Sequence, residues 1–179
     1  MNDDSPDGFP GNPAPGVPLA VAGLRLAGGT DMSGIAGMAL DAVIPALADA
    51  ATVCATERLL RGSPPGQDDP GEIAVRRLGT RFAADGREVP PAAFPPGETL
   101  VFAAESPYAQ CMRTGEPVIF TQPDWQTLER ARPGARSVLS GYDSFLAVPL
   151  SADGFPARPL AATEPAAGFL ALARAPGRP

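Results

Sequence analysis

The sequence predicts a mixed α/β fold, of the α+β type, built around a small antiparallel β-sheet. Two runs near the C-terminal end carry this prediction, Tyr142–Leu150 (YDSFLAVPL) and Gly168–Arg174 (GFLALAR), because both are short, apolar and rich in residues that favour strands. Asp153-Gly154 between them is a turn signal, so the two runs form the end of an antiparallel sheet. Helical spacing and helix-capping residues occur in separate segments earlier in the chain.

The run Tyr142–Leu150 is predicted to be a central strand that is covered on both faces. Phe145, Leu146 and Val148 leave little polar side-chain area to meet water on either side. Pro149 lacks the backbone N–H that a sheet ladder needs, so it is expected near the end of the strand or at a bulge.

The N-terminal region is predicted to be a leader followed by a helix. Residues 1–20 contain five Pro, three Gly and three Asp without periodicity, which is typical of a disordered or loosely attached segment. Val21–Leu26 is compatible with a short strand or with a helix. Thr30 or Asp31 can cap a helix that Pro45 is expected to kink or end. Its apolar positions have helical spacing: Met32, Ile35, Met38 or Ala39, Ala42, Val43 and Ala46.

Two strands and the space for a short third are predicted in the middle of the chain. Ala50–Leu60 is the first strand, and Glu72–Phe82 is the second because two sets of side chains alternate along it. One set is Ile73, Val75, Arg77 and Gly79, and the other is Ala74, Arg76 and Leu78. Arg61–Gly71 is a loop. Val89–Phe102 contains four Pro and is mostly loop, with room for a short strand at Leu100–Phe102.

The clearest helix signal lies between Ser106 and Gly115. Ser106 is a favourable N-cap, Pro107 suits the first helical position, and Gly115 suits the position just after the last turn. One face of this helix carries Tyr108, Cys111 and Met112.

A strand and a second short helix complete the predicted element order. Pro117 prevents the first short helix from continuing, and Val118–Phe120 is predicted as a strand. A helix follows from Asp124 to about Arg132, and Pro133-Gly134 ends it. Its inward-facing residues are Trp125 and Leu128. The chain then enters the strand at Tyr142–Leu150.

Two segments resemble the GAF domain family. Ser144–Leu150 (SFLAVPL), followed by a strand that opens with Gly168, resembles a family strand with a Ser, an alternate Leu and a Val-Pro-Leu end. Ser106–Phe120 (SPYAQCMRTGEPVIF) resembles the family's short helix, Thr-Gly turn and Pro-Val strand. The resemblance covers roughly Thr30–Arg174. It is greatest to the GAF modules of bacterial multidomain proteins that end in a metal-dependent serine phosphatase, which have a similar Ala-Asp-rich first strand, here Leu47–Val53.

The resemblance implies a GAF-like, PAS-related fold: a central antiparallel β-sheet of five to six strands with helices on both faces. It places the domain at residues 21–175, after the leader at 1–20 and before a tail at 176–179. The Pro-rich insertion Phe155–Pro165 and the absence of an effector domain depart from the family pattern. The implied function is that of a regulatory or sensor module in bacterial signal transduction, which binds a small molecule or relays a signal to a protein effector.

The composition of the chain excludes several classes of function. It has 20 acidic residues, 14 Arg and no Lys, a net charge of -6 and a pI near 4.6, so neither nucleic acid nor an anionic membrane is an expected partner. No apolar run approaches the ~18 residues of a membrane span, and the acidic N-terminus is unlike a secretory signal, so a cytoplasmic location is expected. Without His or Lys, the usual haem ligand, His-type zinc sites, Schiff-base catalysis and Walker-type phosphate binding are excluded.

No cofactor is expected, and an enzyme is the least favoured class. The Asn-Lys…Phe-Asp-Glu motif of cyclic-nucleotide-binding GAF domains, the His of haem-binding members and the Pro-x-Ser-Asp-Ile-Pro motif of phytochromes are all missing from the sequence. Cys54 and Cys111 are the candidate nucleophiles for a thiol-dependent reductase. The GAF-like reductase of free methionine sulfoxide carries a further cysteine, so the favoured interpretation is two small buried hydrophobic residues.

A ligand pocket is predicted between the sheet and the two short helices. Its expected lining is Tyr108, Cys111, Phe120, Trp125, Tyr142, Ser144 and Leu146. Apolar and aromatic walls with a few hydroxyls suit a neutral or mildly anionic small molecule, with Arg113 as a candidate cation. The alternative is that these residues form a second hydrophobic core. The apolar helix Asp31–Ile44 is expected either to pack on the sheet or to form a homodimer, and a ligand-free dimerisation or interaction domain is the alternative function.

Overall fold

The described part of the chain in the computed structural model covers residues 32–61, 72–84, 93–121, 123, 125–150 and 166–177. Six strands in this part form one antiparallel sheet in the order β3-β2-β1-β6-β5-β4. In chain order the elements are α2 (Met32–Val43), β1 (Ala50–Thr56), α3 (Glu57–Arg61), β2 (Glu72–Phe82), β3 (Thr99–Ala103), α4 (Pro107–Thr114), β4 (Val118–Phe120), α5 (Trp125–Ala131), α6 (Ala135–Leu139), β5 (Ser144–Leu150) and β6 (Gly168–Arg174).

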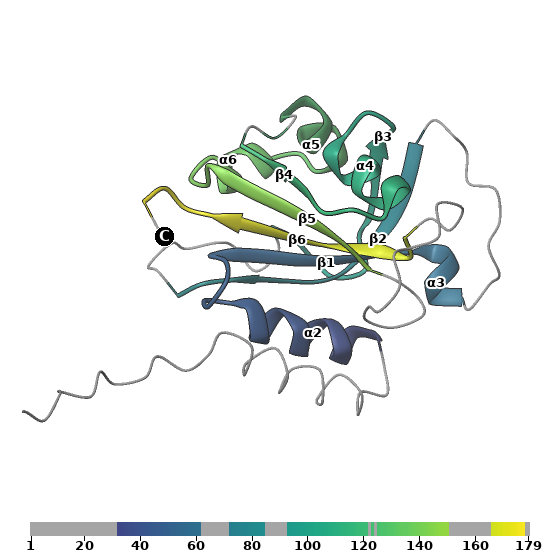
Figure 1. The fold of residues 1–179 in the computed structure, drawn as a ribbon, viewed down its shortest axis with the longest axis horizontal. Coiled ribbons are helices and arrows are strands. Elements are labelled where there is room, and N and C mark those ends of the chain that lie inside the picture. Colours follow the sequence, from purple (N-terminus) through teal and green to yellow (C-terminus); the bar gives the residue numbers. More distant parts are fainter. Residues whose placement is uncertain are drawn as a thin grey trace, which may run out of the picture.

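The sheet separates two layers of helix. α2 lies along one face, and α4, α5 and α6 lie along the other (Figure 1). β1 and β6 are the two middle strands, and they pair with Ala50 opposite Ala173 and Ala55 opposite Gly168. The predicted fold class, a central antiparallel sheet with helices on both faces, is confirmed.

β5 is an interior strand, flanked by β6 and β4, although it begins two residues later than predicted. Its side chains alternate: Phe145 and Ala147 are buried, whereas Leu146 and Val148 are half-buried. Pro149 lies near the end of the strand, as expected. The strand is therefore covered more completely on the face of α4–α6 than on the other, which the uniformly apolar sequence did not indicate.

The signals within α2 and α4 predicted these helices well. The Ser106 side chain accepts a hydrogen bond from the Ala109 backbone N–H (3.1 Å), and Gly115 has φ 66° with its N–H donating to the Cys111 carbonyl. α2 ends at Val43, before Pro45, as expected for a residue that cannot continue a helix. β2, β4 and β6 have the predicted bounds.

The first predicted strand is too long, because Glu57–Arg61 forms the short helix α3. The Thr56 hydroxyl accepts a hydrogen bond from the Leu59 backbone N–H (3.3 Å), which is the contact of a helix N-cap. The same hydroxyl donates to the Ala167 carbonyl (3.0 Å), so Thr56 is held at the end of β1. Capping by Thr56 therefore outweighs the strand preference of the apolar pair Leu59-Leu60.

α6 lies between α5 and β5, where the sequence analysis predicted no helix. Gly134 has φ 86° and changes the direction of the chain after α5. Glu129 of α5 accepts hydrogen bonds from the backbone N–H groups of Gly134 (2.9 Å) and Arg136 (2.6 Å), so it caps the first turn of α6. The capping group comes from the preceding helix, and a local capping pattern does not reveal it.

A β-bulge in β2 changes which side chains meet each helix layer. Val53 pairs with Gly79 and Cys54 with Arg77, which leaves Leu78 without a partner on β1. Leu78 is buried in the cluster against α2, together with Leu40 and Val43 of that helix.

The bulge ends the alternation that was predicted along the strand. Arg77 and Thr80 both face the α4–α6 side of the sheet. Gly79, which was predicted to share a face with Arg77, faces α2 instead. A Cβ added to it would lie 3.0 Å from Leu40 Cδ1.

Several predictions lie outside the described residues. They concern the leader at 1–20, Val21–Leu26, most of the loop Arg61–Gly71 and the insertion Phe155–Pro165. The domain limits, 21–175 with a tail at 176–179, stay predictions. Among the described helices, none is long and apolar enough to cross a membrane.

Candidate functional site

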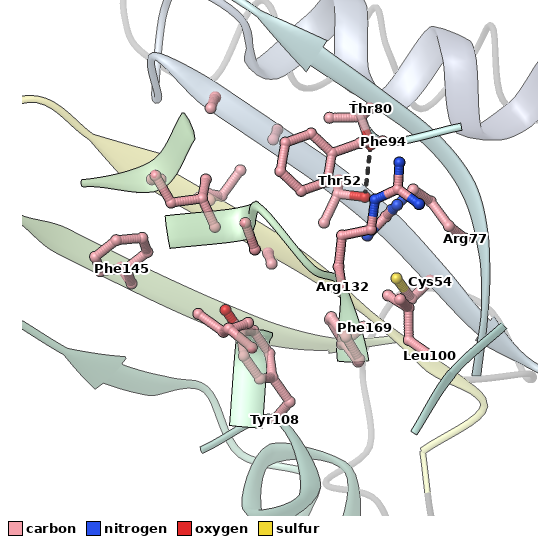
Figure 2. Close-up of a pocket in the computed structure, with 18 of the residues that line it drawn as sticks. Thr52, Cys54, Arg77, Thr80, Phe94, Leu100, Tyr108, Arg132, Phe145 and Phe169 are labelled. Carbon is pink, nitrogen blue, oxygen red and sulfur yellow. Dashed lines mark hydrogen bonds between the residues drawn. The ribbon is translucent and has the colours of Figure 1, made fainter. Parts of the chain in front are cut away.

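A cavity of about 80 Å³ lies between the sheet and the helices α4, α5 and α6. Figure 2 shows Tyr108 and Phe169 towards one end and Thr52, Arg77 and Arg132 at the other. Most of the side chains that line it are apolar or aromatic, and the polar ones gather at the Arg77 end. Such a site has a hydrophobic wall and a localised set of hydrogen-bonding groups, which is the usual make-up of a small-molecule site.

The hydrophobic wall is centred on Tyr108 of α4. Its ring centroid lies 4.7 Å from that of Phe102, 5.1 Å from that of Phe169 and 5.4 Å from that of Phe120. The hydroxyl points towards the interior of the cavity in Figure 2. Burial, reinforced by the neighbouring Cys54, raises the pKa of Tyr108, so the phenol is neutral and can act as a hydrogen-bond donor.

The polar end of the cavity is built on Arg77, Glu98 and Arg132. Arg77 is only 4% exposed and forms an ion pair with Glu98 Oε2, while Arg132 Nη1 donates to Glu98 Oε1 at 2.8 Å. One carboxylate thus meets two guanidinium groups, which leaves this group of three with a formal charge of +1. Burial lowers the pKa of Arg77, but from so high an ordinary value that the guanidinium keeps its charge at neutral pH.

Several contacts hold the two arginines in place. The guanidinium carbon of Arg77 lies 4.9 Å from the centre of the Phe94 ring, and its backbone N–H donates to the Glu98 carbonyl (2.9 Å). Arg132 Nε donates to the Ala93 carbonyl (2.8 Å). The segment before β3 is therefore tied to both guanidinium groups. Arg77 Nε is buried and has no hydrogen-bond partner among the described residues.

The remaining polar groups come from β1 and β2. Thr52 Oγ1 donates to the Gly79 carbonyl (2.9 Å) and lies 3.0 Å from Thr80 Oγ1. Cys54 is completely buried, and burial raises its pKa to about 12, although the nearby Arg77 opposes the shift. Cys54 is therefore a neutral thiol at neutral pH. Since the thiolate is the nucleophilic form, this arrangement suits binding rather than thiol catalysis.

The structure places the seven predicted site residues in three environments. Of the seven, Tyr108 lines the cavity. Cys111, Phe120 and Trp125 pack in the same hydrophobic cluster as Tyr108. Tyr142 is buried in a neighbouring cluster with Phe145.

Ser144 and Leu146 are not brought together with the other five. Leu146 pairs with Leu172, and Leu172 packs against the cluster beneath α2. Directly opposed residues on neighbouring strands share a face, so Leu146 faces the α2 layer, as does Ser144 two positions earlier. The sequence predicted the strand, but in an apolar run it did not show which set of alternate residues faces the short helices.

The sequence analysis missed the polar end of the cavity. Arg113, the candidate cation, is exposed on α4 and does not line it; Arg77 and Arg132 do. One signal was present: Arg77 alternates with Ile73 and Val75 in β2, so a charged residue occupies the otherwise apolar side of that strand. Arg132 gave no comparable signal, because it follows a short helix. No cluster of His, Cys, Asp or Glu that could hold a metal ion occurs in the described ranges.

The chain has the fold of GAF domains in solved structures. The GAF domain of a phosphoenolpyruvate-protein phosphotransferase from Coxiella burnetii superposes with a TM-score of 0.51 at 14% identity, covering 88% of this chain and 76% of that one. The GAF domain of A. aeolicus nlh2 in an inactive state gives 0.50 at 10% identity, covering 88% and 77%. A bacteriophytochrome from R. palustris gives 0.50 at 12% identity, covering 88% of this chain and 31% of that one.

No protein-family model and no curated protein matches the sequence. The predicted resemblance to GAF domains is therefore confirmed through the fold. The finer likeness to modules of serine phosphatases stays a prediction.

Proposed function

We propose that this chain is a non-enzymatic cytoplasmic sensor that binds a small molecule in the cavity beneath α4, α5 and α6. The observation that supports the proposal is the cavity itself, with its aromatic wall around Tyr108 and its polar end at Arg77. The neighbours in fold are GAF domains of bacterial proteins, including a bacteriophytochrome in which the matched region is 31% of the chain. A module that responds to a ligand and acts on a protein effector fits both facts.

The coupling would run through the helices that cover the cavity. Leu128 of α5 and Leu139 of α6 contribute to the lining, so a bound molecule contacts both helices as well as the sheet. Glu129 joins α5 to the start of α6, and Arg132 joins the same region to Glu98. A ligand that prefers one packing of these helices shifts the population towards it, and a partner can bind the altered outer surface.

A thermal-shift screen of small metabolites tests the proposal when it includes a variant whose cavity is filled. Ala135 is buried in α6 and lines the cavity, so Ala135→Leu places three further carbons in it. Gln110→Leu, at an exposed position of α4, is the matched control. We expect compounds that raise the Tm of the parent and of Gln110→Leu but not of Ala135→Leu. A screen in which every stabilising compound also stabilises Ala135→Leu to the same extent would contradict binding in this cavity.

A second candidate function is homodimerisation through the predicted helix Asp31–Ile44. The residues of α2 that are buried are Ala36, Leu40 and Val43. Met32 is 36% exposed, and Ile35 and Met38 are only partly buried. The helix thus has apolar side chains beyond those it needs to cover the sheet, which favours a helix shared between subunits.

Sedimentation velocity over a range of concentrations tests this candidate. We expect a dimer that Met38→Glu dissociates while the monomer stays folded, because a carboxylate in an apolar helix contact is costly to desolvate. A strict monomer at high concentration would exclude the dimer. A dimer that persists in Met38→Glu would place the interface elsewhere.

A further inference from the structure

We infer that the cavity selects a small monocarboxylate, whose carboxylate lies against Arg77 and whose short apolar tail lies against Tyr108 and Phe169. The inference rests on the proposed ligand-binding function and adds the charge and the size of the ligand. Three observations carry it: the charge of the lining, an unsatisfied donor and the volume of the cavity.

The charged side chains that line the cavity are both basic. Arg77 and Arg132 contribute to the lining, and no acidic residue does among those described. Glu98 pairs with both guanidinium groups and can neutralise one of them. This excess of positive charge stands out in a chain with a net charge of -6. A bound carboxylate can pair with the charge that Glu98 leaves, whereas a neutral molecule of the same shape would leave a buried cation without a counter-charge.

Arg77 supplies a donor that the described protein groups do not satisfy. A guanidinium presents its N–H groups in a planar fork that matches the two oxygens of a carboxylate. Glu98 Oε2 accepts from Nη1, while the buried Nε has no partner in the described part of the chain. Buried donors are nearly always paired, so an unpaired one beside a cavity indicates where an acceptor binds. Stacking on Phe94 already fixes the orientation of the group, which lowers the entropy lost on binding.

The volume and the far wall define the rest of the ligand. The cavity of about 80 Å³ is roughly half the ~150 Å³ of an engineered protein cavity that binds benzene, so it suits about three to five non-hydrogen atoms. Opposite Arg77 the wall is formed by Phe169, Leu128 and the ring of Tyr108, whose hydroxyl is polar but carries no charge. A second carboxylate placed there would be buried without a cation, so a dicarboxylate is disfavoured.

Calorimetric titrations at constant ionic strength and pH 7 test the inference on the intact chain. The probes are sodium acetate, propionate and butyrate, their neutral amides, and sodium succinate. We expect propionate to bind and propionamide to bind at least about tenfold more weakly, which corresponds to the loss of one charged contact. Since this comparison uses the parent protein alone, its outcome does not depend on whether any variant folds.

Substitutions locate the binding and supply the control. Arg77→Met should weaken propionate binding about tenfold or more, and Glu98 keeps Arg132 as its ion-pair partner in this variant. Arg113→Gln removes an exposed arginine of α4 and should leave the affinity for propionate unchanged.

The outcomes separate the inference from the function on which it rests. Amides that bind as tightly as the acids, or acids that bind Arg77→Met as tightly as the parent, would overturn the selectivity while ligand binding still stands. If neither the acids, the amides nor the small metabolites of the thermal-shift screen bind, both proposals fail. Selective binding of propionate that depends on Arg77 would support both.

Discussion

The two faces of the sheet are formed by the same strands, but one face is close-packed and the other contains a cavity. On the α2 face, Ala51, Val53 and Ala55 of β1 meet a close-packed cluster in which a Cβ added to Gly79 would lie 3.0 Å from Leu40 Cδ1. On the α4–α6 face, Thr52 and Cys54 of the same strand line a cavity. Neighbouring residues on one strand therefore contribute to a closed core and to a candidate binding site.

This difference shows how a small domain can combine stability with a site. The closed face uses small aliphatic residues under a twelve-residue helix, whereas the cavity face uses aromatic residues under three shorter helices. Close packing maximises stability but leaves no room for a ligand. The bulge at Leu78 allows one strand to serve both purposes, because it turns Arg77 and Thr80 towards the same face.

Truncating a leucine on each face should give the largest contrast. Leu40 is 2% exposed, so Leu40→Ala should lower the free energy of unfolding by about 2–5 kcal/mol, since the close-packed neighbours cannot fill the space. Leu139 is half-buried and already borders the cavity, so Leu139→Ala should cost about 1–2 kcal/mol. Urea unfolding with unchanged m-values is the measurement. Equal costs at the two positions would show that the faces are packed alike.

Enlarging an alanine on each face should also affect stability differently, with the larger loss again on the close-packed face. Ala36 of α2 and Ala135 of α6 are both helical and both 2% exposed. Ala36→Leu overfills the closed face and should destabilise the domain by about 1–3 kcal/mol. Ala135→Leu grows into the cavity and should therefore destabilise the domain less than Ala36→Leu does. If both substitutions destabilise the domain to the same extent, the cavity does not have free volume in solution.

The reactivity of the cysteines reports whether the cavity face opens. Burial raises the pKa of Cys54 to about 12 and that of Cys111 to about 11, so little thiolate forms at pH 8. We expect both thiols to react with iodoacetamide far more slowly in the folded protein than in urea, and the rate to rise as the pH approaches 11. The modification can be followed by mass spectrometry of the digested protein. Fast modification of Cys54 in native buffer would show that this face opens frequently and would favour a thiol-dependent function.

Removing the Glu129 contact between α5 and α6 should have the smallest effect on stability. Hydrogen bonds from the Arg136 and Gly134 backbone N–H groups lower the pKa of Glu129 from its ordinary 4.5. Its stabilising contribution is therefore full above about pH 4.5 and is lost as the pH falls through the lower folded-state value. Glu129→Gln should lower the Tm slightly at pH 7, and the difference should shrink in acid. Glu116→Gln, at an exposed position with no such contacts to α6, is the control; an equal fall in its Tm would argue against a specific cap.

Sequence signals were sufficient where an element is determined by its own residues. α4 carries its caps at Ser106 and Gly115, and β6 begins at Gly168, where an added Cβ would clash with the Cys54 carbonyl. Sequence signals failed where a residue elsewhere in the chain determines the structure. The start of α6 is capped by Glu129 of α5. The face of the sheet on which Leu146 lies is fixed by its pairing with Leu172 of β6.

The candidate site was only half predictable for the same reason. The aromatic wall follows from Tyr108 and the residues around it, which the sequence places on one helix face and nearby strands. The polar end brings together Arg77, Glu98 and Arg132 from separate segments, and it also depends on the bulge in β2. Neither the bulge nor the three-residue contact has a local pattern by which it could be recognised.

Methyl NMR of leucine-labelled protein, titrated with sodium propionate and with propionamide, tests the contrast between the two faces most directly. The cavity face carries Leu100, Leu128 and Leu139, whereas Leu40 and Leu78 lie in the closed cluster against α2. We predict saturable chemical-shift changes for the methyl groups of Leu100, Leu128 and Leu139 with at least one of the two compounds. The methyl shifts of Leu40 and Leu78 should stay unchanged. Shifts confined to Leu40 and Leu78 would contradict the assignment of one face to stability and the other to binding, and the absence of a saturable shift with either compound would contradict a small monocarboxylate as the ligand.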